Sequence, residues 1–230
     1  MMTGIIRNIS ALVKEKESLS LSVIRLILTI DQPLAFLPGQ FIMIHCRAAN
    51  GEIKKRAFSI ASVPSNSQEI ELCIKYVPGG IASEYLFNSV QINSTMKIDG
   101  PYGRFYYENM GTKVLFIAMG TGIAPFMSMI PVAMHDAKVT LLFGFRNPED
   151  FLYKELLESW QSPSFTLVPC MSRPHDGWQG EKGHVQDILR RYLSGNETVY
   201  LCGSPEMVKA CCKVLGDAGI DEKDIKKEQW

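Results

Sequence analysis

Apolar residues in the first hundred positions come in short runs that are separated by turn-forming residues. The runs cover residues 19–28, 40–44, 57–61, 70–76 and 96–98. Residues 19–23 alternate between apolar and polar, and Gly, Pro, Asn and Ser separate the runs, as between short antiparallel strands. One segment has helical spacing instead, with Ile81, Tyr85 and Leu86 near one face. This half of the chain therefore predicts an antiparallel β-barrel interrupted by one helix.

After about residue 112 the apolar runs become continuous and alternate with helical patterns. The strand-like runs cover residues 114–119, 139–143, 165–168 and 198–201. Two apolar helix faces follow the third and fourth of them, at Val185, Ile188, Leu189, Tyr192 and Leu193, and at Val208, Cys211, Val214 and Leu215. Ser204 as N-cap and Pro205 at the first helical position begin the second helix. Alternating strands and helices predict a doubly wound α/β domain with a parallel sheet.

Two turn-forming segments separate these halves. Residues 100–103 read Gly-Pro-Tyr-Gly, and residues 109–112 read Asn-Met-Gly-Thr. Such clusters mark loops, so we expect the domain boundary between about residues 104 and 112. The predicted domains are residues 1–106, the β-barrel, and residues 107–230, the α/β domain.

The composition is that of a globular protein without a charge bias. The chain has 230 residues, 46% of them hydrophobic, and its 24 basic and 24 acidic side chains give a formal net charge of zero. This balance favours neither nucleic acid nor an anionic membrane surface as a partner. Residues 114–134 carry no charge, but two glycines and two prolines interrupt them. We therefore expect a buried strand, turn and helix there, and no membrane insertion.

The six cysteines do not form a metal-binding pattern. They lie at positions 46, 73, 170, 202, 211 and 212, with no Cys-x-x-Cys and no His at ligand spacing. We therefore expect no zinc or iron–sulfur site within this chain. Scattered thiols fit a reducing compartment, and charged residues near the N-terminus argue against a signal peptide, so we expect a cytoplasmic protein.

A glycine turn follows the first strand of the second half. Gly120-Thr121-Gly122 leads to Pro125, a residue suited to the first turn of a helix, and a dinucleotide's phosphates bind at such strand-to-helix turns. The third glycine of the common fingerprint is missing, and the next strand ends in Arg146 where an acidic residue would bind a ribose hydroxyl. Arg146 suggests contact with a phosphate or with the acceptor. A plain strand-to-helix turn explains the glycines about as well.

Three further segments have both a chemical and a structural interpretation. Gly79-Gly80 before Ser83 could expose N–H groups to an anion or simply form a loop before a helix. Phe58 shares one face of a strand with Arg56 and could stack on a flat ligand or belong to the core. Cys202 ends a strand at the sheet edge where ligands bind, or is a small buried hydrophobe.

Six motifs in a fixed order resemble the ferredoxin–NADP⁺ reductase-like flavoprotein family over nearly the whole chain. They are Pro38-Gly39-Gln40-Phe41, Arg56-Ala57-Phe58-Ser59, Gly79-Gly80-x-x-Ser83, Gly100-Pro101-Tyr102-Gly103, Gly120-Thr121-Gly122-x-x-Pro125 and Cys202-Gly203-x-Pro205-x-Met207. The resemblance implies a flavin-binding barrel followed by an NAD(P)-binding domain.

On the flavin side, the resemblance implies that Arg56 holds a phosphate and that Phe58 stacks on the isoalloxazine, where the family more often has Tyr. Ser59 would bond near the reactive nitrogen, and the Gly-Gly helix start favours FAD over FMN. The implied flavin-binding residues are Arg56, Ala57, Phe58, Ser59, Ile74, Lys75, Gly80, Ile81, Ala82 and Ser83.

On the nicotinamide side, Cys202 would lie close to the ring, and the terminal Trp230 is either a loose end or a lid on the flavin. Ser172-Arg173 resembles the 2′-phosphate site of NADPH-selective members, whereas residues 177–180 look more like NADH-using reductases. We lean slightly to NADPH. The implied residues are Thr121, Gly122, Arg146, Ser172, Arg173, Cys202, Gly203, Met207 and Trp230, with Ser59, Cys202 and Trp230 as the catalytic set.

The resemblance implies a reductase that takes hydride from NADPH or NADH onto bound FAD. Electrons then pass to a separate acceptor such as ferredoxin, flavodoxin or an oxygenase component. Two alternatives remain open: a reductase that uses free flavin as its substrate, and a non-catalytic electron-transfer subunit of a larger complex.

Overall fold

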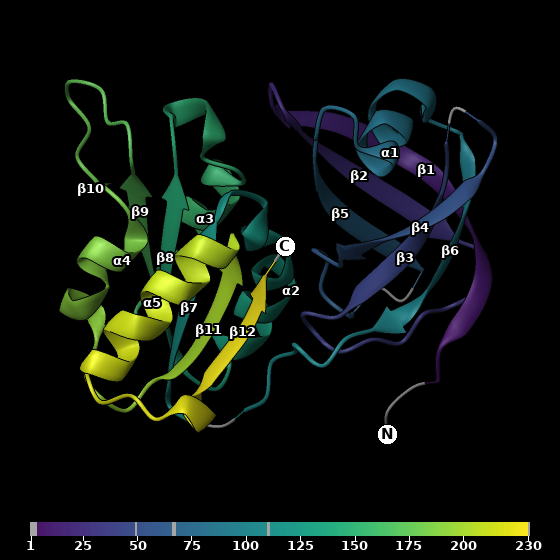
Figure 1. The fold of residues 1–230 in the computed structure, drawn as a ribbon. Helices are drawn as coiled ribbons and strands as arrows, with labels where there is room; N and C mark the ends of the chain where they lie inside the picture. The colour runs from purple at the N-terminus through teal and green to yellow at the C-terminus, as the bar shows by residue number, and fades with distance from the viewer. Residues whose placement is uncertain (1–3, 49, 66–67, 110, 230) are drawn as a thin grey trace. The chain divides into compact units, whose positions relative to one another are not determined.

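The computed structural model describes residues 4–48, 50–65, 68–109 and 111–229 (Figure 1). The chain divides into two compact units. The first comprises Met1–Tyr107 with Met127–Met129, and the second comprises Glu108–Phe126 with Ile130–Trp230.

The N-terminal unit is an antiparallel six-stranded sheet with the order β4-β3-β6-β1-β2-β5, which confirms the predicted barrel (Figure 1). Its strands are β1 (Ile6–Ser20), β2 (Val23–Ile30), β3 (Phe41–Arg47), β4 (Ile53–Ser59), β5 (Glu69–Lys75) and β6 (Thr95–Tyr102). The two edge strands meet through a bridge between Ile60, just after β4, and Leu72 on β5. Alternate residues of β3, namely Ile42, Ile44 and Cys46, are fully buried in the barrel core.

The sequence pattern misplaced the first strand. We expected residues 19–23 to be extended, but Leu21 and Ser22 form the turn between β1 and β2, and Leu21 is 98% exposed. β1 lies earlier and was missed because charged residues occupy much of its length. Only its alternate positions, such as Ile9, Ala11 and Val13, face the core.

The predicted helix is present but begins as α1 (Ile81–Glu84) and continues as the π-helical η1 (Tyr85–Ser89). Its buried residues are Ala82, Ser83 and Leu86, whereas Ile81 and Tyr85 are only half-buried. Leu86 is buried and Tyr85 packs on the core, as expected, but the first turn presents Ala82 and Ser83 to the core in place of Ile81.

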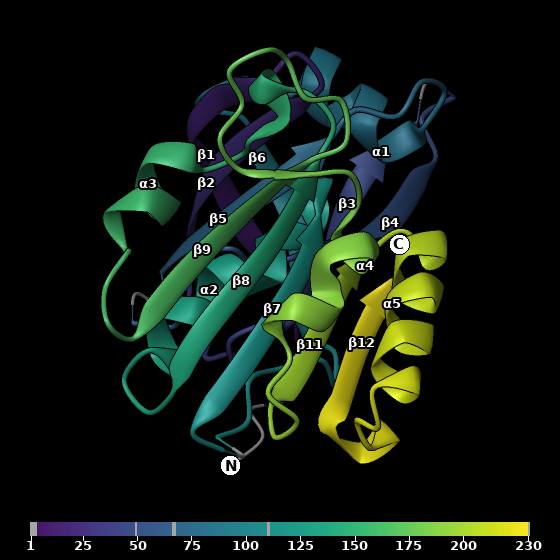
Figure 2. The same cartoon turned by 90° about the vertical axis from the view of Figure 1, so that its left-hand side faces the viewer.

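The C-terminal unit is a parallel six-stranded sheet with the order β10-β9-β8-β7-β11-β12. Its strands are β7 (Lys113–Met119), β8 (Lys138–Phe145), β9 (Phe165–Met171), β10 (Glu181–Lys182), β11 (Thr198–Gly203) and β12 (Ile225–Gln229). Helices α4 (Val185–Ile188) and α5 (Pro205–Asp217) lie on one face, with α2 (Ala124–Ala133) and α3 (Lys154–Ser159) on the other (Figures 1 and 2). The remaining short helices are η2 (Gly120–Ile123), η3 (Pro148–Asp150), η4 (Leu189–Tyr192) and η5 (Glu222–Asp224). This arrangement confirms the doubly wound α/β domain.

The long uncharged segment forms β7, η2 and α2, as predicted. In the described part of the chain, no helix is long and apolar enough to cross a membrane. α2 does not end before Pro131, as proline sterics suggested, but continues to Ala133. The hydrogen-bonding pattern resumes when the Met134 N–H donates to the Ile130 carbonyl at 3.0 Å, and burial of the helix offsets the missing proline N–H.

Candidate functional site

The Arg56–Ser59 motif forms the last part of β4. Pairing with β3 places Arg56 opposite Ile44 and Phe58 opposite Ile42, so both point to the core side of the sheet, as the sequence predicted. Phe58 is half-buried and packs on the barrel core, while the Arg56 guanidinium is exposed and donates to the Lys55 carbonyl at 2.9 Å. Ser59, buried, and Ala57, half-buried, point to the opposite side. The strand end therefore combines an accessible cation with an aromatic ring on one side.

Glycine is required in the loop that leads into α1. Gly79 has φ +73°, and a Cβ on Gly80 would lie 2.9 Å from Ser83 Oγ and 3.0 Å from the Val77 carbonyl oxygen. The Ser83 hydroxyl accepts from the Val77 N–H at 3.1 Å and donates to the Val77 carbonyl at 2.8 Å. Ser83 thus maintains the shape of the loop, a role that the sequence had not shown.

Sequence reasoning missed Glu84, the residue directly after this motif. Its carboxylate accepts from the Tyr76 hydroxyl at 2.6 Å, the Asn88 amide at 2.6 Å and the Gly79 N–H at 3.2 Å. The Tyr76 hydrogen bond, followed by that of Gly79, lowers the pKa of Glu84, which stays ionised. Glu84 therefore fixes the glycine loop from the helix side. An acidic residue next to Gly-Gly-x-x-Ser was the available signal.

Lys16 of β1 fixes the other end of the same helix. Its ammonium donates to the carbonyls of Phe87 at 2.8 Å and Val90 at 2.7 Å, where helical carbonyls lack partners. Burial lowers the pKa of Lys16. At the end of β5, Ile74 is buried and Lys75 is exposed. Helix α1–η1 is thus held to the barrel at both ends.

These residues fit a flavin with a phosphate tail. The first N–H groups of α1 have no intrahelical partner, and Arg56 supplies a cation that makes no ion pair with a described residue. Gly79 faces open space, because nothing lies within 4 Å of its would-be Cβ. The donors suit phosphate oxygens, and the Phe58 ring suits a flat heterocycle.

The glycine turn of the C-terminal unit is a 3₁₀ turn, η2, between β7 and α2. Gly120 has φ +54°, and a Cβ at Gly122 would lie 2.3 Å from the Cys202 carbonyl oxygen. The sequence suggested close approach to a ligand, but the small size of Gly122 serves the contact between this turn and the end of β11. Thr121 between them is half-buried. Pro125 lies in the first turn of α2, as predicted.

The end of β11 is tightly packed. Cys202 is fully buried and Met207 nearly so, as expected of a small hydrophobe at position 202, and a Cβ on Gly203 would lie 2.4 Å from the Met207 methyl carbon. Ser204 caps α5 by accepting from the Met207 N–H at 3.2 Å, with Pro205 beginning the helix as predicted. A coenzyme bound here would contact backbone atoms at the end of β11, because the Cys202 thiol is buried.

Sequence reasoning also missed Glu228 on β12, which pairs with Cys202. Its Oε2 is buried and has no hydrogen-bond partner among the described residues. Burial raises the pKa of Glu228 to about 7. No feature of the sequence distinguishes Glu228 from the polar residues beside it. Trp230, two residues later, lies outside the described residues.

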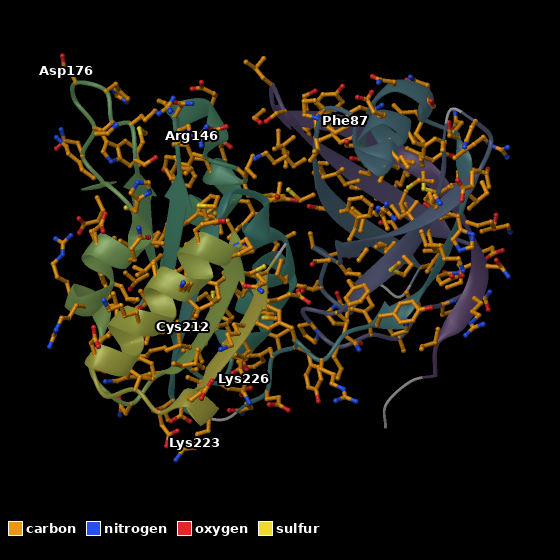
Figure 3. All side chains as sticks on the ribbon, in the orientation of Figure 1. Phe87, Arg146, Asp176, Cys212, Lys223 and Lys226 are labelled. Atoms are coloured by element: carbon orange, nitrogen blue, oxygen red, sulfur yellow. The ribbon has the colours of Figure 1, made fainter. Side chains whose placement is uncertain are left out.

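The structure brings Arg146 and Arg173 together. The ladder between β8 and β9 extends beyond the strands, with the Ser172 N–H donating to the Phe145 carbonyl at 2.9 Å and the Arg173 N–H to the Arg146 carbonyl at 3.0 Å. Both arginine side chains are exposed, and neither makes an ion pair with a described residue (Figure 3). Trp178 packs edge-on against Phe145 at 5.8 Å and supports the loop that follows. The backbones of two arginines that make no ion pair with a described residue thus lie next to each other at the carboxyl edge of the sheet.

Two family models match the chain in this order. Residues 10–107 match the oxidoreductase FAD-binding domain, and residues 116–213 match the oxidoreductase NAD-binding domain. These matches confirm the predicted pair of cofactor-binding domains.

Related proteins match nearly the whole chain. Ferredoxin–NADP reductase B from Sorangium cellulosum is 32% identical over 210 residues, covering 85% of this chain and 85% of that protein. The reductase component DmpP of phenol 2-monooxygenase from Pseudomonas sp. is 31% identical over 233 residues, covering 96% of this chain and 64% of that protein. The chain spans 64%, 66% and 62% of the lengths of DmpP and of two further curated relatives.

Among solved structures, the Amycolatopsis cytochrome P450 reductase GcoB superposes with a TM-score of 0.91 at 26% identity, covering 100% of this chain and 71% of that one. Sequence, family models and fold agree. The chain belongs to the ferredoxin–NADP⁺ reductase-like family of flavoprotein oxidoreductases, with an FAD-binding barrel followed by an NAD-binding α/β domain.

Proposed function

We propose that this protein is an NAD(P)H-dependent FAD reductase that supplies electrons to a separate acceptor protein. The observation that carries the proposal is the glycine loop before α1, fixed by Glu84 and Ser83 and lying in a unit that matches an FAD-binding domain. Several relatives are named as reductase or electron-transfer components of oxygenase systems. An oxygenase component or a ferredoxin is accordingly the proposed class of acceptor.

Residues 1–106 form the proposed flavin domain. Arg56 and the N–H groups of Ile81, Ala82 and Ser83 bind phosphate oxygens, while Gly80, whose N–H donates to the Val77 carbonyl at 2.9 Å, lets the phosphate approach the loop. Phe58 packs on the isoalloxazine, and Ser59 donates a hydrogen bond near its reactive edge. Ala57, Ile74 and Lys75 contribute backbone. When bound, FAD accepts a hydride and releases electrons singly, while the chain supplies alignment and electrostatics.

Residues 107–230 form the proposed nicotinamide-nucleotide domain. Thr121, Gly122, Gly203 and Met207 shape the floor of the coenzyme site, and Cys202 lies nearest the nicotinamide. Arg146, Ser172 and Arg173 bind the 2′-phosphate, because two exposed arginines on neighbouring backbone segments, without ion pairs to described residues, suit a phosphate dianion. This arrangement favours NADPH over NADH.

Trp230 is proposed to cover the flavin face that the nicotinamide must reach. Replacing it by Ala should raise affinity for NAD⁺ and NADP⁺, which binding titrations on the FAD-loaded protein measure. Unchanged affinity for both nucleotides would remove Trp230 from the mechanism.

The cysteines support a reducing, cytoplasmic location. All six are free thiols, and five of them are buried.

The visible spectrum of the purified protein, before and after anaerobic NADPH or NADH, tests the function. A yellow protein bleached by one nucleotide supports the proposal and names the donor. A colourless protein that oxidises NAD(P)H only with added flavin would instead indicate a reductase of free flavin. A colourless and inactive protein would contradict both.

A further inference from the structure

A cavity of about 320 Å³ lies within the C-terminal unit at the amino edge of the parallel sheet. It is formed by the first residues of β7 and β8, the start of β9, and the segment after α4 that includes Arg191, Ser194 and Glu197. β7 runs from Lys113, which lines the cavity, to Met119, which precedes the glycine turn. The lining residue of β7 nearest that turn is Leu115, and at about 3.3 Å per residue four steps place it about 13 Å from Met119. The cavity is therefore separate from the proposed coenzyme site.

The sheet face beneath the cavity changes character along the strands. Near the carboxyl edge, Leu142 of β8 and Val168 of β9 are buried in the hydrophobic core that also contains α4 and α5. Two residues earlier in each strand, the paired positions on the same face are Thr140 and Thr166. Among the described residues, no helix lies in front of this part of β8 and β9 (Figure 2). Because α4 is only four residues long, Thr140 and Thr166 are left uncovered by it and form this part of the sheet floor beside Leu115 of β7.

Positive charge gathers around this floor. Lys113 and Lys138 are paired residues on adjacent strands, where like charges repel each other. Neither makes an ion pair with a described residue; Lys113 donates to the Ser194 hydroxyl at 2.9 Å. Arg191 adds a third cation, and its guanidinium bonds Glu181 at 2.7 Å. No described carboxylate therefore offsets the repulsion between the two paired lysines.

The one carboxylate in the cavity lining does not neutralise them. Glu197 is 7% exposed and accepts from the Ser194 N–H at 2.6 Å and the Gly195 N–H at 3.1 Å. Burial opposes ionisation, but these bonds and that of the Ser194 hydroxyl keep the pKa of Glu197 below its usual value. Glu181 pairs with Arg191, so with Glu197 counted the formal charge around the cavity is about +1, and it resides on the two lysines.

We propose that this amino-edge cavity binds a small polyhydroxylated phosphate monoester, such as a sugar phosphate. Lys113 and Lys138, which make no ion pair with a described residue, pair with the phosphate, and Thr140 and Thr166 hydrogen-bond the hydroxyls. At about 30 Å³ per water, the cavity holds the volume of about ten waters, more than a lone phosphate fills. The hydroxyls of Thr140 and Thr166 give a polyol hydrogen-bond partners that an aromatic body would leave unused.

The test is a titration of the FAD-loaded protein, saturated with NADP⁺ so that the coenzyme's phosphate sites are filled. Ribose 5-phosphate, ribose and inorganic phosphate are compared by the chemical shifts of the Thr140 and Thr166 amides. We expect saturable shifts with ribose 5-phosphate and weaker binding of both fragments. Equal affinity for inorganic phosphate would mean that the cavity binds an adventitious ion only, which would overturn the proposal. The absence of chemical-shift changes at these two amides would overturn it as well.

Two variants localise the binding. Lys138→Ala should weaken ribose 5-phosphate about tenfold or more, since a hydrogen bond to a charged group contributes roughly 1.5–3 kcal/mol. Lys213→Ala removes an exposed cation from α5 outside the cavity and should change affinity less than about twofold. Equal effects of the two substitutions would show non-specific attraction and contradict the site. Lys138 is exposed, so its loss should leave the fold intact, which circular dichroism checks.

Discussion

Glu228→Gln is the change for which the structure gives the clearest magnitude. Burial raises the pKa of Glu228 from 4.5 to about 7, and its Oε2 has no partner among the described residues. The folded state therefore holds the proton more tightly than the unfolded state. Because the folded pKa is the higher one, ionisation of Glu228 costs stability as pH rises from about 4.5 to about 7. At 1.36 kcal/mol per unit, the cost is about 3 kcal/mol, complete above pH 7.

Glutamine cannot ionise, so the variant should lack this pH dependence. The free energy of unfolding of the wild type should fall by about 3 kcal/mol relative to that of Glu228→Gln between pH 4.5 and pH 8. The difference in slope is the readout, because a buried amide without a partner itself costs about 1–3 kcal/mol at every pH.

Urea unfolding followed by tryptophan fluorescence measures this effect in the relevant unit. All three tryptophans, at positions 160, 178 and 230, belong to the C-terminal unit. Glu222→Gln removes an exposed carboxylate from the same unit and serves as the control. Parallel stability curves for the wild type and Glu228→Gln across this pH range would refute the reasoning, since they would show that Glu228 titrates normally.

Three further changes test other parts of the molecule. Arg173→Ala should raise the KM for NADPH about tenfold more than the KM for NADH, and equal loss in steady-state kinetics would exclude a 2′-phosphate contact. Gly122→Ala, whose Cβ would lie 2.3 Å from the Cys202 carbonyl oxygen, should lower stability by about 1–3 kcal/mol in urea unfolding. Gly216→Ala, which meets nothing within 4 Å on α5, should not lower it. Asp99→Asn should cost about 2 kcal/mol at pH 7 by calorimetry, and the difference should shrink below pH 4.

The Asp99 prediction follows from its buried hydrogen bonds. Asp99 is 1% exposed, and burial alone would raise its pKa. Hydrogen bonds from Lys55 at 2.7 Å, the Asn8 N–H at 2.8 Å and His45 at 2.9 Å lower that pKa to about 2. The stabilisation is therefore present above pH 3.8 and is lost as pH falls through about 2. A difference that persisted unchanged at pH 2 would contradict this account.

Local patterns were sufficient to predict most of the architecture. Continuous apolar runs such as β7 mark strands of a parallel sheet because both faces of such a sheet are covered. The turn at Gly120 and the cap at Ser204 depend on the conformational demands of single residues, so they too are legible in the sequence. β1 escaped because residues 14–18 are polar on both faces and the exposed Leu12 lies between the buried Ala11 and Val13, so its apolar and polar residues do not alternate regularly.

Tertiary structure decided the features that depend on register. Arg146 and Arg173 become neighbours only because β8 and β9 pair in parallel, and Glu228 acquires its raised pKa only where β12 packs beside β11. The paired lysines at the amino edge likewise follow from the β7–β8 register. The sequence by itself determined the two domains and their motifs, since periodicity and turn chemistry are local. Which charges meet, and which are buried, depends on contacts between distant residues that only the folded chain specifies.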